Sequence, residues 1–215
     1  MGCSGEVIVN EKSTKKKYFK SSEINNSSDI SYEKNRKTNI GIQNQNVSII
    51  NINKKNKKKD SEINVLSEEE KSKYRKEMFD KHFNFRKNHG CSDDFKLDDH
   101  LNKIAQDYAK NIINSNNIIY NNYTYKGEAL GENIAINKGK IDPNDICNQW
   151  YKEGDKYNYS NKFQKEAIHF TQIVWKNTKR VGFGFEIKDN IYYVVALYYP
   201  AGNIFNEFVN NVGKK

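Results

Sequence analysis

Three polar side chains stand in otherwise apolar stretches of the sequence, where a buried site could form. Glu132 lies in Gly-Glu-Asn-Ile-Ala, Glu153 follows Gln-Trp-Tyr-Lys, and His169 begins a segment rich in aromatic residues. Two carboxylates and one imidazole can bind a divalent metal or act as acid and base. Spacing alone does not show that they converge, and it favours the alternative of three isolated, hydrogen-bonded residues.

Three helices are expected to position these side chains. A capping box, Ser67-x-x-Glu70, opens the first helix, and Gly90 is expected to end it. The second helix has two aspartates near its N-terminal end and is predicted from apolar residues at helical spacing, namely Leu97, Leu101, Ile104, Tyr108 and Ile112. Asp142 and Pro143 supply an N-cap and a first-turn proline for the third helix.

The last third of the chain is typical of β-strands. Residues 181–187 and 191–199 are rich in β-branched and aromatic side chains and are separated by Lys188, Asp189 and Asn190, which predicts a hairpin. Residues 133–136 are a shorter strand candidate. Residues 191–199 are almost continuously apolar, so helices must cover both faces of the sheet. The prediction is an α+β fold, a three-layer α-β-α sandwich with a mainly antiparallel central sheet.

The positive charge of the chain is concentrated in its first third. Residues 1–66 carry 13 basic and 7 acidic side chains, +6 of the formal net charge of +9. Their long Asn, Lys and Ser runs predict a disordered basic tail over residues 1–66, followed by a folded domain over residues 67–215. No apolar run approaches the roughly 18 residues of a membrane-spanning helix, and no signal peptide is found. The cytosol is therefore the expected compartment, with Cys91 and Cys147 as free thiols.

The first residues are candidates for lipid attachment. Gly2 is placed for myristoylation and Cys3 for palmitoylation, although Glu6 stands where the motif has Ser or Thr. One myristoyl chain binds bilayers weakly, so a second signal at an anionic membrane surface would come from Cys3 or from a basic run, Lys15, Lys16 and Lys17. An ordinary solvated tail is the alternative. The lysine run at 54–59 has no aromatic residue for base stacking, so nucleic acid is not an expected partner.

A set of sequence blocks follows the order of one known family. The segment from His169 to Thr178 is followed by Val-Gly-Phe-Gly, and three further blocks are Gly131-Glu-Asn-Ile-Ala135, Gln149-Trp-Tyr-Lys-Glu153 and Tyr198-Tyr-Pro-Ala-Gly-Asn-Ile204. Together with His82-Phe-Asn-Phe-Arg86, they resemble the CAP superfamily of cysteine-rich secretory proteins, insect antigen 5 and plant pathogenesis-related proteins. The resemblance is closest to the Golgi-associated branch, whose members lack a signal peptide.

This resemblance implies an α-β-α sandwich with a central cleft lined by two His and two Glu, which in many members holds a divalent metal such as zinc. Glu132, Glu153 and His169 match three of the four positions. Tyr120 stands at the fourth position, and a neutral tyrosine is a poor zinc ligand at pH 7. Weak or absent zinc binding is therefore expected, and no other cofactor.

The resemblance implies lipid binding, which occurs in several branches of the family. The leading hypothesis is a non-enzymatic protein that is attached to membranes through Gly2, Cys3 and the basic tail and that binds a lipid or a protein partner, which includes a second copy in a homodimer. Its expected place is the cytoplasmic face of Golgi-like endomembranes, or the cytoplasm. Sterol-binding relatives use a mobile aromatic loop, for which Tyr120, Tyr123 and Tyr125 are candidates, with core packing as the favoured interpretation. Two alternatives stay open, a metal-dependent hydrolase of the peptidase type and a secreted, extracellular effector.

Overall fold

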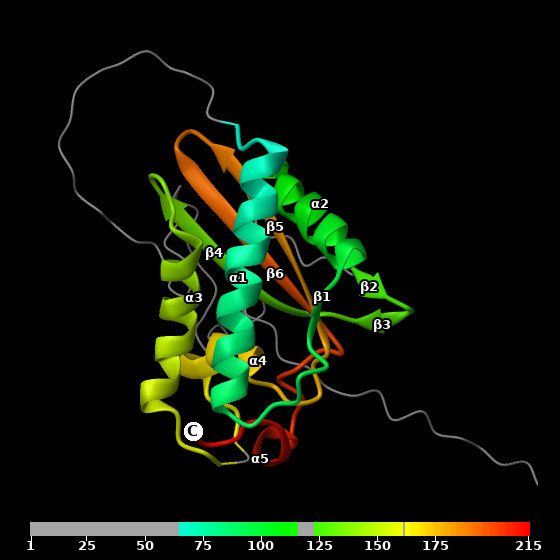
Figure 1. Ribbon diagram of the computed structural model, residues 1–215, viewed down its shortest axis with the longest axis vertical. Coiled ribbons are helices and arrows are strands. Elements are labelled where there is room, and N and C mark those ends of the chain that lie inside the picture. The colour runs from blue at the N-terminus through cyan, green and yellow to red at the C-terminus, as the bar shows by residue number, and fades with distance from the viewer. Residues whose placement is uncertain (1–64, 116–122, 161) are drawn as a thin grey trace, which may run out of the picture.

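A computed structural model describes residues 65–115, 123–160 and 162–215. The helices are α1 (Glu68–Asn88), α2 (Asp99–Ser115), α3 (Pro143–Lys152), α4 (Ile168–Ile173) and α5 (Phe208–Asn211), with 3₁₀ turns η2 (Glu153–Lys156) and η3 (Lys165–Ala167). The strands are β1 (Lys96–Leu97), β2 (Thr124–Tyr125), β3 (Glu128–Ala129), β4 (Gly131–Lys138), β5 (Arg180–Lys188) and β6 (Ile191–Tyr199). Figure 1 shows α1 in front of the sheet, with α3 and α2 to either side of it.

The main sheet has the strand order β1-β5-β6-β4. Strands β5 and β6 form the predicted hairpin, and β4 pairs antiparallel with β6 on the other side, while β1 pairs parallel with β5. The hairpin turns at Asp189 and Asn190, whose φ angles are 51° and 59°. Asp and Asn tolerate this left-handed conformation better than most residues, which is why the strands can reverse within two residues. The mainly antiparallel sheet is therefore confirmed.

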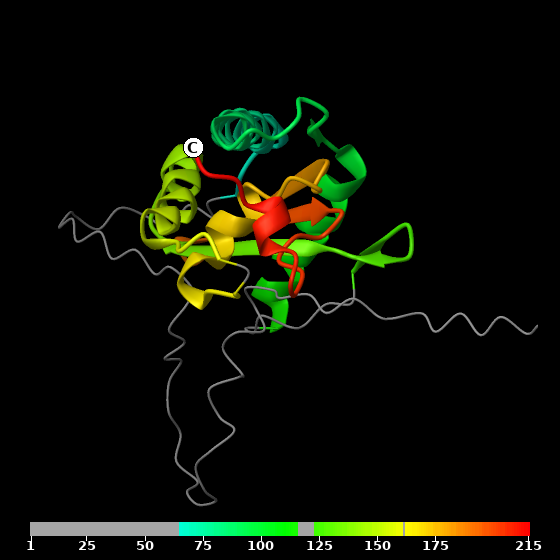
Figure 2. The same ribbon diagram turned by 90° about the horizontal axis from the view of Figure 1, so that it is seen from below.

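The two faces of the sheet carry separate apolar clusters, which makes the three layers. The larger cluster joins α1, α3 and α4 to one face, with Phe183 and Phe185 of β5 at its centre. The smaller cluster joins α2 to the other face, through Val195 and Leu197 of β6 among others. Figure 2 shows α1 and α3 together above the sheet. Because β6 contributes side chains to both clusters, its continuous apolar character is explained, and the predicted sandwich is confirmed.

Two glycines in β5 let α2 lie directly against the sheet. A Cβ atom added at Gly182 would lie 2.3 Å from the backbone nitrogen of Asn102, and one added at Gly184 would lie 2.2 Å from the backbone of Ala105. Both neighbours are helix backbone, which cannot move aside as a flexible side chain would. The close contact between α2 and β5 therefore depends on the absence of side chains at these positions.

Gly184→Ala is accordingly expected to destabilise the domain. Overpacking of this kind costs about 1–3 kcal/mol, and here the helix itself must shift. The measurement is the free energy of unfolding from urea denaturation, followed by tryptophan fluorescence. Ser115→Ala, at the end of the same helix, is the control and should change stability little. An unchanged unfolding midpoint for Gly184→Ala would contradict the close packing of α2.

The outer edge of β5 is covered by side chains instead of a neighbouring strand. Asn102 Oδ1 accepts from the N–H of Phe183 at 2.8 Å, and Gln106 Oε1 accepts from the N–H of Phe185 at 3.2 Å. Gln106 Nε2 donates to the carbonyl of Phe185 at 2.9 Å, and Arg75 Nε donates to that of Phe183 at 3.2 Å. The outward backbone groups of Phe183 and Phe185, just past the short β1 pairing, are thus satisfied without another strand.

The first helix begins as predicted. Ser67 accepts a hydrogen bond from the backbone of Glu70, and the Glu70 side chain accepts one from the backbone of Ser67, which completes the capping box. Leu66, just before the cap, is buried in the larger core cluster. The packed region therefore includes at least one residue that the sequence analysis assigned to the tail.

The start of the second helix differs from the prediction. Leu97 was expected as its first apolar position, but Leu97 is extended in β1 and pairs with Val181. The helix begins at Asp99, because Asp98 Oδ1 accepts from the backbone N–H of Leu101 at 3.0 Å and so satisfies the first turn. Leu97 stands four residues before Leu101, which is helical spacing, but it does not belong to the helix. It pairs with Val181, on a strand far away in the sequence.

Two other strand predictions also differ in extent. The candidate at residues 133–136 is part of the longer β4, which pairs with β6 from Gly131 to Lys138. The short β2–β3 hairpin was not expected, although Lys126 and Gly127 at its turn have positive φ angles of 52° and 78°. Figure 1 shows this hairpin projecting from the body of the domain.

Several of the predicted functional residues lie outside the described residues. They are Gly2, Cys3, Lys15, Lys16 and Lys17 in the N-terminal segment and Tyr120 in the segment after α2. Within the described ranges, none of the helices combines the length and apolar character that a bilayer-spanning helix needs.

Candidate functional site

Glu153 and His169 are joined directly where α3 ends and α4 begins. Glu153 Oε1 lies 2.6 Å from His169 Nδ1, and Oε2 accepts from the backbone N–H groups of His169 at 3.0 Å and Phe170 at 3.4 Å. One carboxylate therefore binds both the ring and the first turn of the helix that carries it. Both oxygens of Glu153 are engaged, so this residue positions the imidazole.

The imidazole of His169 is fixed on its face as well as at its edge. Its ring stacks on Trp150 with centroids 5.8 Å apart and an angle of 12° between the planes. Nδ1 faces the carboxylate of Glu153 and donates its hydrogen to Oε1. Nε2 is buried, and no hydrogen-bond partner for it lies among the described residues. The pair with Glu153 therefore leaves one imidazole nitrogen for a ligand or for water.

Glu132 lies in a different row of side chains from this pair. It is buried at the start of β4, in register with Leu197 and Gly182, and that row faces α2. The next residue, Asn133, points to the opposite face and donates from Nδ2 to the backbone carbonyl of His169 at 3.2 Å. The structure thus brings Glu153 and His169 together, while a cleft shared with Glu132 and Tyr120 stays a prediction.

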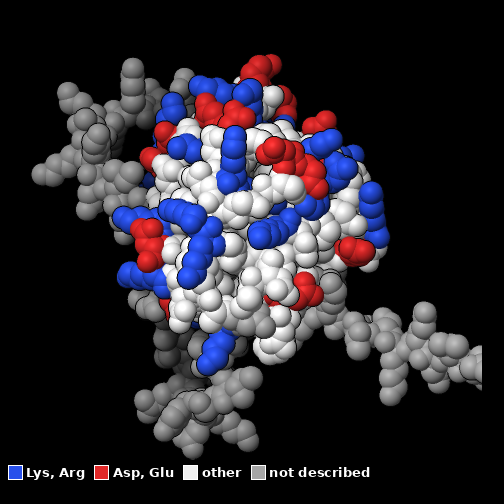
Figure 3. Space-filling view, turned by 60° about the horizontal axis from the view of Figure 1, so that its bottom comes forward, with Lys and Arg blue, Asp and Glu red and all other residues white. Residues whose placement is uncertain are grey.

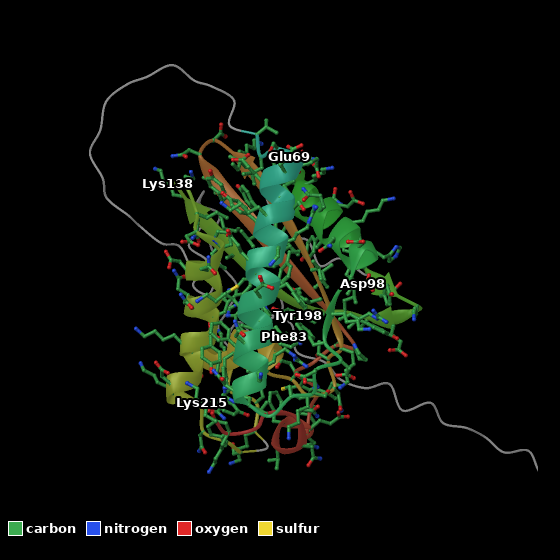
Figure 4. The ribbon with its side chains drawn as sticks, in the orientation of Figure 1. Glu69, Phe83, Asp98, Lys138, Tyr198 and Lys215 are labelled. Carbon is green, nitrogen blue, oxygen red and sulfur yellow. The ribbon has the colours of Figure 1, made fainter. Side chains whose placement is uncertain are left out.

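A buried polar chain connects this site to the centre of the core. His82 Nδ1 contacts the carbonyl of Met78 at 2.8 Å, and its Nε2 lies 2.8 Å from the hydroxyl of Tyr198. Asn133 Nδ2 donates to the same hydroxyl at 3.1 Å, as well as to His169. Figure 4 labels Tyr198, which lies between the sheet and α1. These hydrogen bonds fix the start of β4, α1 and α4 relative to one another.

Burial keeps the side chains of His82 and Tyr198 uncharged. Desolvation lowers the pKa of His82 to about 3, and it raises the pKa of the Tyr198 phenol well above its usual range. Sequence reasoning named neither residue as functional, although each is the first residue of one of the family-like blocks.

Comparison with known proteins gives the family. The family model for CAP, the cysteine-rich secretory protein family, matches residues 79–199, more than half of the chain. The chain belongs to the CAP family. Its resemblance to Golgi-associated plant pathogenesis-related protein 1 of Homo sapiens amounts to 34% identity over 143 residues, which cover 65% of this chain and 92% of that protein.

Other relatives match a smaller share of their own length. Protein PRY2 of Saccharomyces cerevisiae is 35% identical over 138 residues, which cover 63% of this CAP protein and 40% of PRY2. Among solved structures, the crystal structure of NaASP2 with Zn²⁺ superposes with a TM-score of 0.51 at 24% identity and covers 71% of this chain and 90% of that one. This last likeness supports the CAP fold alone.

The aromatic residues proposed for a sterol loop are partly accounted for by packing. Tyr123 lies 5.4 Å from Tyr108 and its hydroxyl accepts from Asn111 at 2.7 Å. Tyr125 lies 4.7 Å from Tyr199, and both Tyr123 and Tyr125 pack against the α2 cluster. Core packing was the favoured interpretation of these two rings, and the contacts agree with it. Cys91 and Cys147 are free thiols, as expected.

The donor atoms of this CAP domain do not make a metal centre by themselves. Within the described ranges, no three His, Cys, Asp or Glu side chains are grouped so that they could hold an ion. Zinc sites in proteins use three or four protein ligands, whereas Glu153 is already bound to His169 and to two backbone amides. A single imidazole nitrogen is a weak anchor, so the residues present fit zinc poorly.

Protein purified without added metal is expected to contain well below one zinc ion per chain. The measurement is elemental analysis by mass spectrometry after gel filtration. His169→Ala is the control, because zinc that remains in this variant is bound elsewhere on the chain. One ion per chain in the native protein, lost in His169→Ala, would contradict the weak-binding prediction.

Proposed function

We propose that this protein is a non-enzymatic CAP protein that associates with intracellular membranes. Acyl groups at Gly2 and Cys3 and the basic run at Lys15, Lys16 and Lys17 attach it, and the domain binds a lipid or a protein partner. The observation that carries the proposal is the likeness to a Golgi-associated relative along 92% of that protein. It agrees with an N-terminal sequence that places Gly2 beside a cysteine.

The charge of the chain supports an attachment through the tail. Residues 67–215 carry 23 basic and 20 acidic side chains, so most of the excess positive charge precedes the domain. Figure 3 shows basic and acidic groups interspersed on the face of the domain that it presents, with white areas between them. Each Lys or Arg near an anionic leaflet contributes about 1 kcal/mol. The tail is therefore the stronger electrostatic contact with a membrane.

The described thiols and carboxylates give little support to hydrolysis. Burial raises the pKa of Cys91 and raises that of Cys147 still further, so neither sulfur is an activated nucleophile. Glu153 accepts hydrogen bonds at both oxygens, which leaves it poorly placed to take a proton from water. These contacts favour a structural role for the site pair.

Gly2→Ala is expected to release the protein from membranes. The substitution keeps the α-amino group but adds a methyl side chain at a position where myristoylation requires glycine, so no myristoyl chain is attached and the palmitoylation of Cys3 has no first anchor. The measurement is the membrane-bound fraction of the full chain in its own cells, with Cys3→Ser as a partial-loss comparison. Retention of Gly2→Ala in the membrane fraction at the native level would refute the anchor.

The secreted alternative makes a separate prediction about glycan. The Asn158-Tyr-Ser160 triplet is a glycosylation sequon, and the asparagine itself is exposed, so an oligosaccharyltransferase could reach it. A protein on the cytoplasmic face carries no glycan there. A mass shift after treatment with a glycosidase would place the domain in the secretory pathway instead.

A further inference from the structure

A pocket of about 260 Å³ lies beside the Glu153–His169 pair, at the end where α1 and α3 meet the C-terminal residues. Its walls combine three aromatic rings with charged groups of both signs: Tyr151, Tyr159, Phe170, Asp155, Lys214 and Lys215. Figure 4 shows Lys215 near the lower end of α3. Aromatic faces together with a carboxylate and two ammonium groups therefore meet at the margin of the larger core cluster.

The ring of Tyr151 lines the pocket with one of its faces. Its other face stacks on Phe85, with centroids 3.8 Å apart and an angle of 2° between the planes. His89 Nε2 lies 3.0 Å from the Tyr151 hydroxyl, and His89 Nδ1 contacts the carbonyl of Gly213 at 2.7 Å. The ring is therefore preorganised, and only its pocket face is open to a ligand.

The chain itself places cations on these rings. Lys215 Nζ lies 4.9 Å from the centre of the Tyr151 ring, and Lys214 Nζ lies 5.8 Å from that of Tyr159. Both are cation–π distances, and both lysines are exposed, so they can leave without a change in the core. Two ring faces that hold ammonium groups in this way show the kind of ligand the pocket accepts.

The Phe170 ring of the pocket depends on a neighbouring glycine, Gly154. A Cβ atom added at Gly154 would lie 2.6 Å from the Phe170 ring, so the ring fits only because Gly154 is glycine. Phe170 also lies 5.8 Å from Tyr151, which brings the two rings to one corner of the pocket. Asp155 follows Gly154 directly and supplies the negative charge that a bound cation would meet.

We propose that this pocket binds a phosphocholine group. The quaternary ammonium would replace the lysine ammonium groups on Tyr151 and Tyr159 and face Asp155, while Lys214 and Lys215 turn to the phosphate. Aromatic cages recognise quaternary ammonium ions in this manner. A zwitterion fits the two signs of charge in the pocket better than a simple cation or a simple anion does. The source is a soluble phosphocholine or a choline lipid at a membrane, and the lipid source rests on the proposed membrane association.

The test is titration of the full chain with free phosphocholine, followed by NMR or calorimetry without any membrane. Tyr159→Leu is expected to weaken binding about tenfold, and Tyr159→Phe, which keeps the ring, is expected to bind as the native chain does. The carbon isostere 3,3-dimethylbutyl phosphate, which keeps the phosphate and has an uncharged tert-butyl group in place of the ammonium, should also bind about tenfold more weakly than phosphocholine. In the double variant Lys214→Ala, Lys215→Ala, phosphocholine should lose its advantage over choline.

The result that overturns the proposal is equally direct. Equal binding of the carbon isostere or of inorganic phosphate, or no binding of phosphocholine at millimolar concentration, would mean that the pocket does not recognise the ammonium group. Gly2→Ala protein mixed with phosphatidylcholine vesicles separates the two sources, since this variant has no myristoyl anchor. Vesicle binding that Tyr159→Leu abolishes supports a lipid, and binding of free phosphocholine alone supports a soluble ligand. Both binding measurements are independent of whether the protein is attached to membranes through Gly2 in cells.

Discussion

Arg86→Met is expected to lower the free energy of unfolding by about 4 kcal/mol or more, because three buried carbonyls would lose a charged donor. Arg86 is 1% exposed, and its guanidinium donates to the carbonyls of Ile173 at 2.8 Å, Trp175 at 2.8 Å and Thr178 at 2.6 Å. It also lies 4.1 Å from the centre of the Phe95 ring. One side chain of α1 therefore holds the whole segment that follows α4.

The measurement for Arg86 is guanidinium denaturation followed by far-UV circular dichroism. Arg86→Lys is the matched control, because lysine keeps the charge but has a single nitrogen in place of the planar fork. It should recover less than half of the lost stability. Since a domain is stable by only about 5–15 kcal/mol, Arg86→Met is expected to lose a large share of its stability and to unfold at a much lower denaturant concentration. A loss below about 1 kcal/mol would show that the three carbonyls find other donors.

The second large effect is a loss of stability in mild acid that originates at His82. Desolvation lowers the pKa of this fully buried imidazole to about 3, with a smaller contribution in the same direction from the charge of Arg86. The unfolded chain takes up a proton near pH 6.5, whereas the folded chain does not until about pH 3. The contribution of His82 is therefore complete above pH 6.5 and is lost as pH falls from there toward 3. Its full size is about 5 kcal/mol, because each pKa unit is worth about 1.4 kcal/mol.

The measurement for His82 is the free energy of unfolding at half-unit intervals from pH 7.5 to 4. His82→Gln is expected to be less stable at neutral pH and to show a shallower decline below pH 6.5. NMR of the native imidazoles gives a second readout that does not depend on the variant folding, since His82 should show no titration between pH 8 and 5. A normal titration of His82 in that range would refute its burial as a neutral group.

Local signals allowed much of the fold to be predicted. The capping box at Ser67, the Asp142 N-cap with Pro143, and the turn at Asp189 each act within a few residues, and each element begins where its signal stands. The position of Leu97 was predicted wrongly, because a two-residue strand is defined by its partner Val181 and not by its own neighbours. The layer order followed from the apolar character of β6, which reports on both faces at once.

The candidate site was predictable to a smaller degree. The family-like blocks pointed to Glu153 and His169, and these two side chains are in contact. The chain through His82, Tyr198 and Asn133 was not predictable, because its hydrogen bonds join residues that are far apart in the sequence and meet only after the three layers pack. Long-range polar contacts of this kind depend on packing and leave no periodic pattern.

The covered edge of β5 has a consequence for crowding. Asn102, Gln106 and Arg75 occupy the backbone groups that a strand from a second molecule would need in order to extend the sheet. If the protein gathers on a membrane as we propose, many copies would lie close together with their domains free to collide. Encounters at the β5 edge would then end in separation, because the side-chain amides of α2 already occupy the backbone groups there.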